Sequence, residues 1–203
     1  MTSSQKGEFG DAFGAFTSVF SAFGFAGVLL TLWHQRQSST KQSFETTVFG
    51  LLQTHAQIIQ DIDIQAGTGV VSYRGRDCFR RYYAHIGRHY RTLTSAHPTV
   101  LDGELVVEAF NLMYEKHRHN LGHYLRFTYN IFRYIDEADI EESAKIKYSR
   151  IVRSQISDYE LLVLFYNCLH TNGEQRFKPL VEQYALFNNL PIGLLIRSEH
   201  RGF

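Results

Sequence analysis

The sequence predicts an all-α protein, in which an N-terminal transmembrane or membrane-associated helix is followed by a compact helical bundle. Three observations predict this fold. An uncharged apolar segment lies near the N-terminus, apolar residues recur every three or four positions through the rest of the chain, and only 3 of 203 residues are proline. The length suits one folded core with an appended segment. We therefore expect a membrane segment at residues 1–36 and one helical domain at residues 37–203.

The apolar segment runs from Ala12 to Trp33 without a charged residue. At ~1.5 Å per residue, a helix of this length crosses the ~30 Å hydrocarbon core of a bilayer. This helix carries two stripes. Small residues recur every fourth position, at Gly10, Gly14, Ser18, Ala22 and Ala26. Phenylalanines recur at spacings of four and three, at Phe9, Phe13, Phe16, Phe20 and Phe23. Because small residues let helices approach closely in lipid, we expect a homo-oligomer through the small-residue ridge.

Two other interpretations compete with membrane insertion. A signal peptide would need a basic start and a small-residue cleavage site, whereas the acidic residues Glu8 and Asp11 precede this segment. An amphipathic helix packed on the domain is the other alternative, because glycine, serine and threonine dilute the apolar content. Arg36 and Lys41 follow the segment and Lys6 precedes it, and this excess of basic residues predicts that the C-terminal side is cytoplasmic.

The helices of the domain are indicated by apolar spacing and by cap signals. We expect them near residues 44–62, 76–93, 102–113, 124–135, 141–153, 157–169 and 179–187, with the apolar 161–169 helix central and buried. No strand shows clear alternation.

Single residues mark the expected helix ends in the domain. Asp102 is expected to cap its helix, Gly122 to break or bend the chain and Gly173 to stop a helix. Ser157 and Glu160 have capping-box spacing, in which the Ser hydroxyl binds the Glu backbone N–H and the Glu side chain reaches back.

Several short motifs resemble those of a known protein family. They are Gly122-His123-Tyr124-Leu125-Arg126, Gln155-Ile156-Ser157-Asp158-Tyr159-Glu160-Leu161-Leu162 with Phe165-Tyr166-Asn167-Cys168, and Phe177-Lys178-Pro179-Leu180. Together with flanking residues, they make most of the chain, residues 9–190, similar to the putative phage abortive infection proteins of bacteria. Leu125 stands where the family motif leads us to expect Phe. The resemblance implies a single-pass helical protein of the bacterial inner membrane that acts in anti-phage defence, and it implies no catalytic residue.

An alternative hypothesis makes the protein an enzyme. The run from Arg118 to His123 fits the Arg-polar-x-x-x-His pattern of the HEPN ribonucleases. In such a metal-independent site, the Arg holds the scissile phosphate and the His transfers a proton. Arg80 and His85 share the spacing by chance, and a histidine buried in the bundle is the competing interpretation of His123. The residues thus leave open whether the protein is an enzyme.

No motif of this sequence predicts a cofactor or a metal. Cys78 and Cys168 are far apart in sequence and fit buried free thiols rather than metal ligands. Of the central histidines, only His119 and His123 form a helical pair, and a third ligand is not evident. There is no P-loop, GxGxxG or GxSxG pattern.

A basic stretch lies before the middle of the chain. It has six arginines against the single Asp77: Arg74, Arg76, Arg80, Arg81, Arg88 and Arg91. Near a membrane it would attract anionic headgroups, and its interleaved tyrosines could instead stack on nucleic-acid bases. The third interpretation is a solvated helix face with its tyrosines packed inward. Candidate partners are therefore the membrane, a second copy of the chain, a phage component and nucleic acid.

Overall fold

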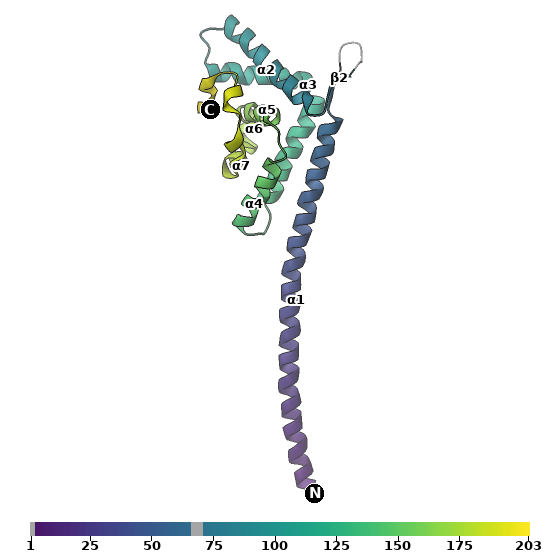
Figure 1. Cartoon of the computed structure of the whole chain (residues 1–203). Helices are drawn as coiled ribbons and strands as arrows, with labels where there is room; N and C mark the ends of the chain where they lie inside the picture. The colour runs from purple at the N-terminus through teal and green to yellow at the C-terminus, as the bar shows by residue number, and fades with distance from the viewer. Residues whose placement is uncertain (1–2, 66–70) are drawn as a thin grey trace. The chain divides into compact units, whose positions relative to one another are not determined.

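The computed structural model describes residues 3–65 and 71–203, and it confirms the predicted all-α fold (Figure 1). Helices make up 82% of it, and little of it is strand. The chain divides into two units, Met1–Thr46 and Thr47–Phe203. The first helix, α1 (Ser3–Asp61), runs through the boundary between them. The division that we predicted after residue 36 lies inside this helix and stays a prediction.

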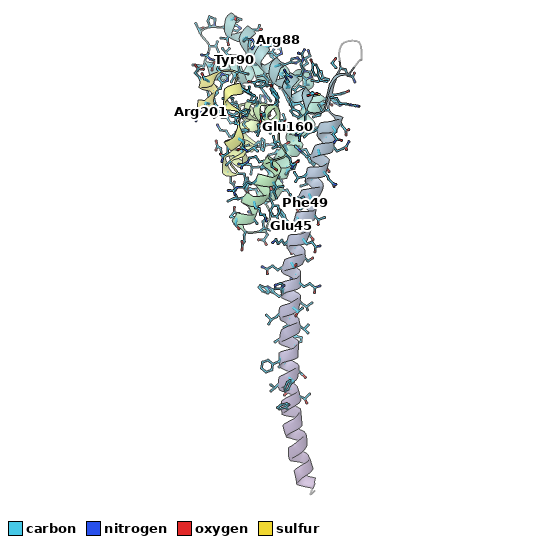
Figure 2. The ribbon with its side chains drawn as sticks, viewed as in Figure 1. Glu45, Phe49, Arg88, Tyr90, Glu160 and Arg201 are labelled. Atoms are coloured by element: carbon cyan, nitrogen blue, oxygen red, sulfur yellow. The ribbon has the colours of Figure 1, made fainter. Side chains whose placement is uncertain are left out.

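Unit 1 is the first part of α1, and its described side chains from Phe16 to Ser43 are all exposed (Figure 2). Phe16, Phe23 and Trp33 are each more than 60% exposed. In the described part of the chain, α1 is the one helix that is long and apolar enough to cross a membrane. The predicted stripe members Phe9, Gly10 and Phe13 lie where the structure does not describe side chains.

Unit 2 contains the last part of α1, a short antiparallel hairpin and the remaining helices. The strands β1 (Asp63–Gln65) and β2 (Val71–Arg74) pair, with Asp63 opposite Arg74. The helices are α2 (Asp77–Ala96), α3 (Asp102–Asp136), α4 (Glu142–Arg153), α5 (Asp158–Leu169), α6 (Thr171–Arg176) and α7 (Lys178–Gln183), and three 3₁₀ turns follow at Leu186–Asn189, Ile192–Leu194 and Ser198–Gly202. Strands this short cannot show an alternating pattern, which is why the sequence did not predict them.

The helix α5 is central to unit 2, as predicted. Every residue from Glu160 to Tyr166 is buried, and α5 contacts both α2 and α3 (Figure 1). Because neighbours cover α5 all round, its sequence is apolar on all faces rather than in one stripe. Cys168 on α5 and Cys78 on α2 are both buried free thiols, as predicted. Burial raises the pKa of Cys78 to about 11 and that of Cys168 to about 12, so both remain protonated at neutral pH.

Two glycines do not end helices as predicted. The helix α3 continues from Asp102 to Asp136 straight through Gly122, where an added Cβ would lie 3.0 Å from the Tyr114 hydroxyl. The helix α5 ends before Gly173, which lies inside α6, and an added Cβ there would lie 1.9 Å from the Asn167 carbonyl oxygen. Both glycines therefore permit close packing, and neither terminates a helix.

Asp102 fastens the C-terminal segment of unit 2 and does not cap α3, contrary to our prediction. The buried His200 places its Nε2 2.9 Å from Asp102 Oδ2 and its Nδ1 3.0 Å from the Tyr166 hydroxyl. The Tyr90 hydroxyl donates a hydrogen bond to the same carboxylate. These contacts join the last residues of the chain to α2, α3 and α5.

Buried histidines predict that the protein is less stable in acid. Burial and the nearby Arg76 lower the pKa of His55 from 6.5 to about 4. Between pH 6.5 and 4, His55 therefore binds a proton in the unfolded chain but not in the folded chain, so the free energy of unfolding falls as the pH is lowered through this range. We expect His55 alone to reduce the free energy of unfolding by about 2 kcal/mol on going from pH 7.5 to 5.

Thermal unfolding of the full chain in detergent, followed by circular dichroism, checks this prediction. The difference in unfolding temperature between pH 7.5 and pH 5 should shrink in His55→Gln. It should stay unchanged in His34→Gln, because His34 is exposed. An equal pH dependence in both variants would contradict the prediction.

Candidate functional site

The motifs that carry the family resemblance come together in unit 2 around a buried carboxylate. Glu160, at the first turn of α5, has no exposed surface (Figure 2). Its Oε1 accepts a hydrogen bond from the Ser157 hydroxyl at 2.6 Å, and its Oε2 accepts one from the Tyr124 hydroxyl at 3.1 Å. Arg76 completes the set, with its Nε 3.5 Å from Glu160 Oε1. Tyr124 belongs to the first motif, and Ser157 and Glu160 belong to the second.

The predicted capping box is half correct. The Glu160 carboxylate reaches back to the Ser157 backbone N–H, as predicted. The Ser157 hydroxyl makes no hydrogen bond to the helix backbone, because it donates to the carboxylate instead. A buried carboxylate without hydrogen-bond donors costs more free energy than a backbone N–H of the first helical turn that lacks its side-chain cap, so the hydroxyl binds the carboxylate.

The contacts of Glu160 extend to three other segments. Arg76 also donates to the Gln155 carbonyl at 2.8 Å, which fixes the chain just before α2 to the chain just before α5. On α3, the Tyr124 carbonyl accepts from the Thr128 hydroxyl at 2.9 Å, and that hydroxyl lies 3.1 Å from His55 Nε2 on α1. One polar network therefore connects α1, α2, α3 and α5 through the core of unit 2.

The electrostatics of this network indicate a structural anchor. Burial raises the pKa of Glu160, and the hydrogen bonds from Ser157 and Tyr124 together with the charge of Arg76 offset only part of that rise. The Tyr124 hydroxyl is fully buried, and burial raises its pKa well above the usual value. Both carboxylate oxygens are occupied by donors of the protein itself, which suits a role in holding helices together.

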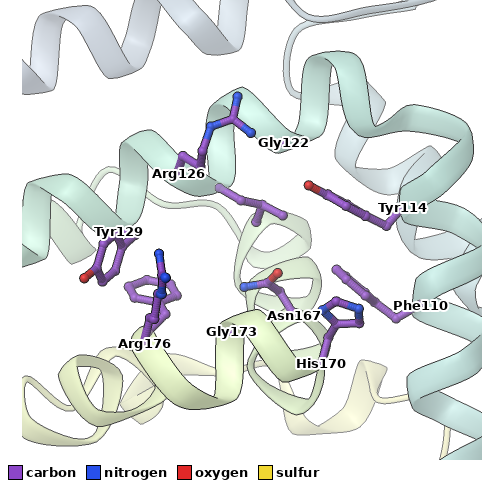
Figure 3. Close-up of a pocket in the computed structure, with 11 residues that line it drawn as sticks. Phe110, Tyr114, Gly122, Arg126, Tyr129, Asn167, His170, Gly173 and Arg176 are labelled. Carbon is purple, nitrogen blue, oxygen red and sulfur yellow. The ribbon is translucent and has the colours of Figure 1, made fainter.

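A cavity of about 280 Å³ is the second feature built by the motifs (Figure 3). It lies between α3, α5 and α6, and eleven residues line it: Phe110, Tyr114, Gly122, Leu125, Arg126, Tyr129, Asn167, His170, Gly173, Arg176 and Phe177. Gly122, Leu125 and Arg126 come from the first motif, Asn167 from the second and Phe177 from the third. Figure 3 shows Arg126 on the α3 side and Arg176 rising from α6 toward α3.

The lining of this cavity is cationic and aromatic. It contains the two guanidinium groups of Arg126 and Arg176, the imidazole of His170 and the amide of Asn167, and the lining residues that the structure describes include no carboxylate. Sequence analysis missed the site as a whole, since Tyr114, His170 and Arg176 come from separate turns whose spacing shows no pattern. The cavity could have been suspected from one observation, namely that Arg126 and Asn167 belong to two different family motifs.

The structure does not bring Arg118 and His123 together within one chain. Both are exposed on the continuous helix α3, where positions five apart point about 140° away from each other. Arg118 Nη1 lies 3.5 Å from Glu115, and the His123 ring lies edge-on to Phe127. The competing interpretation of His123 as a buried residue of the bundle was wrong, because its side chain faces outward.

The basic stretch lies on β2, at the start of α2 and along α2, and its arginines have different surroundings. Arg76 is held by Glu160, Arg81 lies 5.5 Å over the Tyr73 ring, and Arg74 and Arg88 are exposed. Arg80 and Arg91 border a hollow beside Tyr159.

The tyrosines of this stretch mostly face inward. Tyr82 is fully buried and Tyr90 is 4% exposed, so neither can stack on a nucleic-acid base. The arrangement is that of a solvated arginine face over packed tyrosines, and binding of lipid or nucleic acid by these arginines stays a prediction.

The burial of Glu160 predicts a large loss of stability when its carboxylate is removed. Glu160→Ala leaves the hydroxyls of Tyr124 and Ser157 without their acceptor, and we expect it to lower the free energy of unfolding by about 3 kcal/mol. Glu174→Ala removes an exposed carboxylate on α6 and should cost less than about 0.5 kcal/mol. Urea unfolding of the full chain in detergent, followed by helical circular dichroism, measures both. Equal stability of the two variants would show that the network does not hold the bundle.

Comparison with known proteins gives one family match. Searches of curated proteins and of solved structures returned no match. The match covers residues 116–195, which run from the middle of α3 to the C-terminal turns and include most of the cavity and the Tyr124, Ser157 and Glu160 part of the network. Arg76 and His55, the other members of the network, lie outside the match. Residues 9–115, to which we had also extended the resemblance, lie outside it. Over residues 116–195 the chain matches the family described as putative phage abortive infection protein, which confirms the resemblance predicted from its motifs.

Proposed function

We propose that this chain acts in bacterial defence against phage by abortive infection, as a membrane-anchored helical effector or sensor. The family match over residues 116–195 is the observation that carries the proposal. The matched segment contains the second half of α3, the helices α4 to α7 and most of the cavity lining, so the part shared with the family includes the hydrogen bonds of Glu160 to Tyr124 and Ser157. The apolar part of α1 supplies the proposed anchor.

The exposure of α1 supports the anchoring. Large apolar side chains stand on all sides of the helix between Phe16 and Trp33, and none of them is buried in the chain. Water would hydrate this surface at a cost of about 25 cal/mol per Å² of apolar area, whereas lipid covers it without that cost. The hydroxyl of Thr31 donates to the Gly27 carbonyl at 2.8 Å, so this polar group needs no water.

The charges that flank the apolar run favour one orientation. Arg36 and Lys41 follow it, and basic residues accumulate on the cytoplasmic side of membrane helices. In our proposal the helix crosses the bacterial inner membrane once and unit 2 is cytoplasmic. There it meets the phage component or nucleic acid that triggers defence, with the exposed arginines of α2 as one candidate contact.

Self-association of the anchor is part of the proposal. The ridge of Gly14, Ser18, Ala22 and Ala26 continues the pattern that begins at Gly10. At Gly14, apart from its chain neighbours and the backbone of its own helix, no described atom lies within 4 Å of the position that a Cβ would take, so a second helix has room to approach there. An oligomer assembled in the membrane would place several copies of unit 2 on the same cytoplasmic surface.

The anchoring is tested by charges placed inside and outside the apolar run. Phe23→Arg/Leu29→Arg puts two cations in the proposed bilayer core, at about 2.5–3.5 kcal/mol each, and should abolish both membrane fractionation and protection against phage. Gln37→Arg/Ser39→Arg adds the same charge beyond Trp33 and should leave both unchanged. Fractionation and plaque counts at matched protein levels give the readout. A soluble Phe23→Arg/Leu29→Arg protein that still protects would overturn the anchoring.

The ribonuclease hypothesis predicts that Arg118→Ala/His123→Ala abolishes protection against phage. Because Arg118 and His123 are exposed and point apart, we expect instead that the double variant protects cells as well as the wild type does. Plaque counts measure protection, and circular dichroism verifies the fold. Loss of protection in a correctly folded double variant would restore these residues as catalytic candidates.

A further inference from the structure

We propose that the cavity between α3, α5 and α6 binds a small ligand that carries both a phosphate group and a planar ring, such as a nucleoside monophosphate. The proposal stands on the cavity itself and does not depend on anchoring or on phage defence.

The phosphate half of the proposal comes from two arginines without counter-ions. In the described part of the chain, neither Arg126 nor Arg176 has a hydrogen bond or an ion pair, whereas Arg76, Arg133 and Arg197 each pair with a carboxylate. Both side chains are exposed at the rim of the cavity, one on α3 and one on α6, and so are free to bind an anion that enters it. The planar donor fork of arginine fits phosphate oxygens in a bidentate manner.

Neutral donors of the cavity add to the arginine pair. The Asn167 amide and the His170 ring line the same space, and each offers an N–H to a phosphate or to a ring substituent. Figure 3 shows both side chains between the aromatic residues on one side and Arg176 on the other. The charged and neutral donors thus come from three elements around one cavity, with the Arg126 guanidinium at its rim and directed away from Asn167 and His170 in Figure 3.

The ring half comes from aromatic side chains at the other end of the cavity. Phe110 and Tyr114 are stacked, with ring centroids 6.0 Å apart and planes 11° apart. The His170 ring lies 5.8 Å from Phe110 and 6.3 Å from Tyr114. Because Phe110 is only 1% exposed, the half-buried rings of Tyr114 and His170 are the aromatic surfaces on which a base could stack beside the arginines.

The size of the cavity limits the ligand to one small molecule. Its volume of about 280 Å³ lies just below the ~300–1,000 Å³ that small-molecule sites enclose. Gly122 lies beside two of the lining side chains, since a Cβ there would lie 3.0 Å from the Tyr114 hydroxyl and 3.2 Å from Arg126 Nη1. A methyl group at position 122 would shift the Tyr114 hydroxyl and the Arg126 guanidinium by a few tenths of an ångström, and we assign both side chains to ligand binding.

Calorimetric titration of the full chain in detergent tests the ligand class. The probes are AMP, GMP, CMP and UMP, together with adenosine and inorganic phosphate as the two halves of AMP. We expect at least one monophosphate to bind with a dissociation constant below about 1 mM, and adenosine and phosphate each to bind at least about tenfold more weakly. Absence of binding by all four monophosphates, or equal binding of phosphate alone, would overturn the proposal.

Matched variants locate the binding. Arg126→Ala/Arg176→Ala should weaken monophosphate binding at least about tenfold, and Arg150→Ala/Arg201→Ala, which removes two exposed arginines elsewhere, should change it less than about twofold. Gly122→Ala keeps all the charges and should also weaken binding, since it displaces Arg126 and Tyr114. Equal losses in the two arginine pairs would show binding by general charge and contradict the site. If the wild-type chain binds no monophosphate yet protects cells against phage, the ligand proposal is refuted and the proposed function is not.

Discussion

The fold of unit 2 depends on a carboxylate that is buried where charge is costly. Glu160 has no exposed surface, and it is tolerated there because Ser157, Tyr124 and Arg76 all direct donors at it. Each donor comes from a different part of the chain, so satisfying one side chain fixes the starts of α2 and α5 and the middle of α3. The two longest motifs of the family resemblance meet at this point, which gives them a physical reason to occur together.

The position of the cavity follows from the same contact. Tyr124, which binds Glu160, is flanked on α3 by Gly122 and Arg126, and these line the cavity. Asn167, about two turns after Glu160 on α5, lines it from the other helix. The hydrogen bond between Tyr124 and Glu160 therefore sets the spacing and rotation of α3 against α5, and the cavity is what that arrangement leaves open beside the closely packed Gly173.

The sequence predicted the helices well because apolar spacing reports directly on burial, as the continuous apolar run of α5 shows. It failed where one residue type serves two purposes. Gly122 and Gly173 looked like helix breakers, whereas the structure uses them for close packing. Arg118 and His123 match the spacing of the ribonuclease pattern, but side chains five positions apart on a continuous helix point away from each other. The family motifs contain Arg126 and Asn167, but His170 and Arg176 could not be predicted as their neighbours, since they approach α3 only after the chain has folded.

In the proposed arrangement, α1 crosses the membrane and leaves unit 2 in the cytoplasm. Labelling of single cysteines in spheroplasts with a membrane-impermeant maleimide tests it most directly. Cys78 and Cys168 are buried, at 0% and 2% exposure, so the native background is low. The account predicts that Ser4→Cys is labelled in intact spheroplasts and that Ser39→Cys is labelled only after lysis. Protection of both positions until lysis would contradict a membrane-spanning α1, and labelling of Ser39→Cys alone would contradict its orientation.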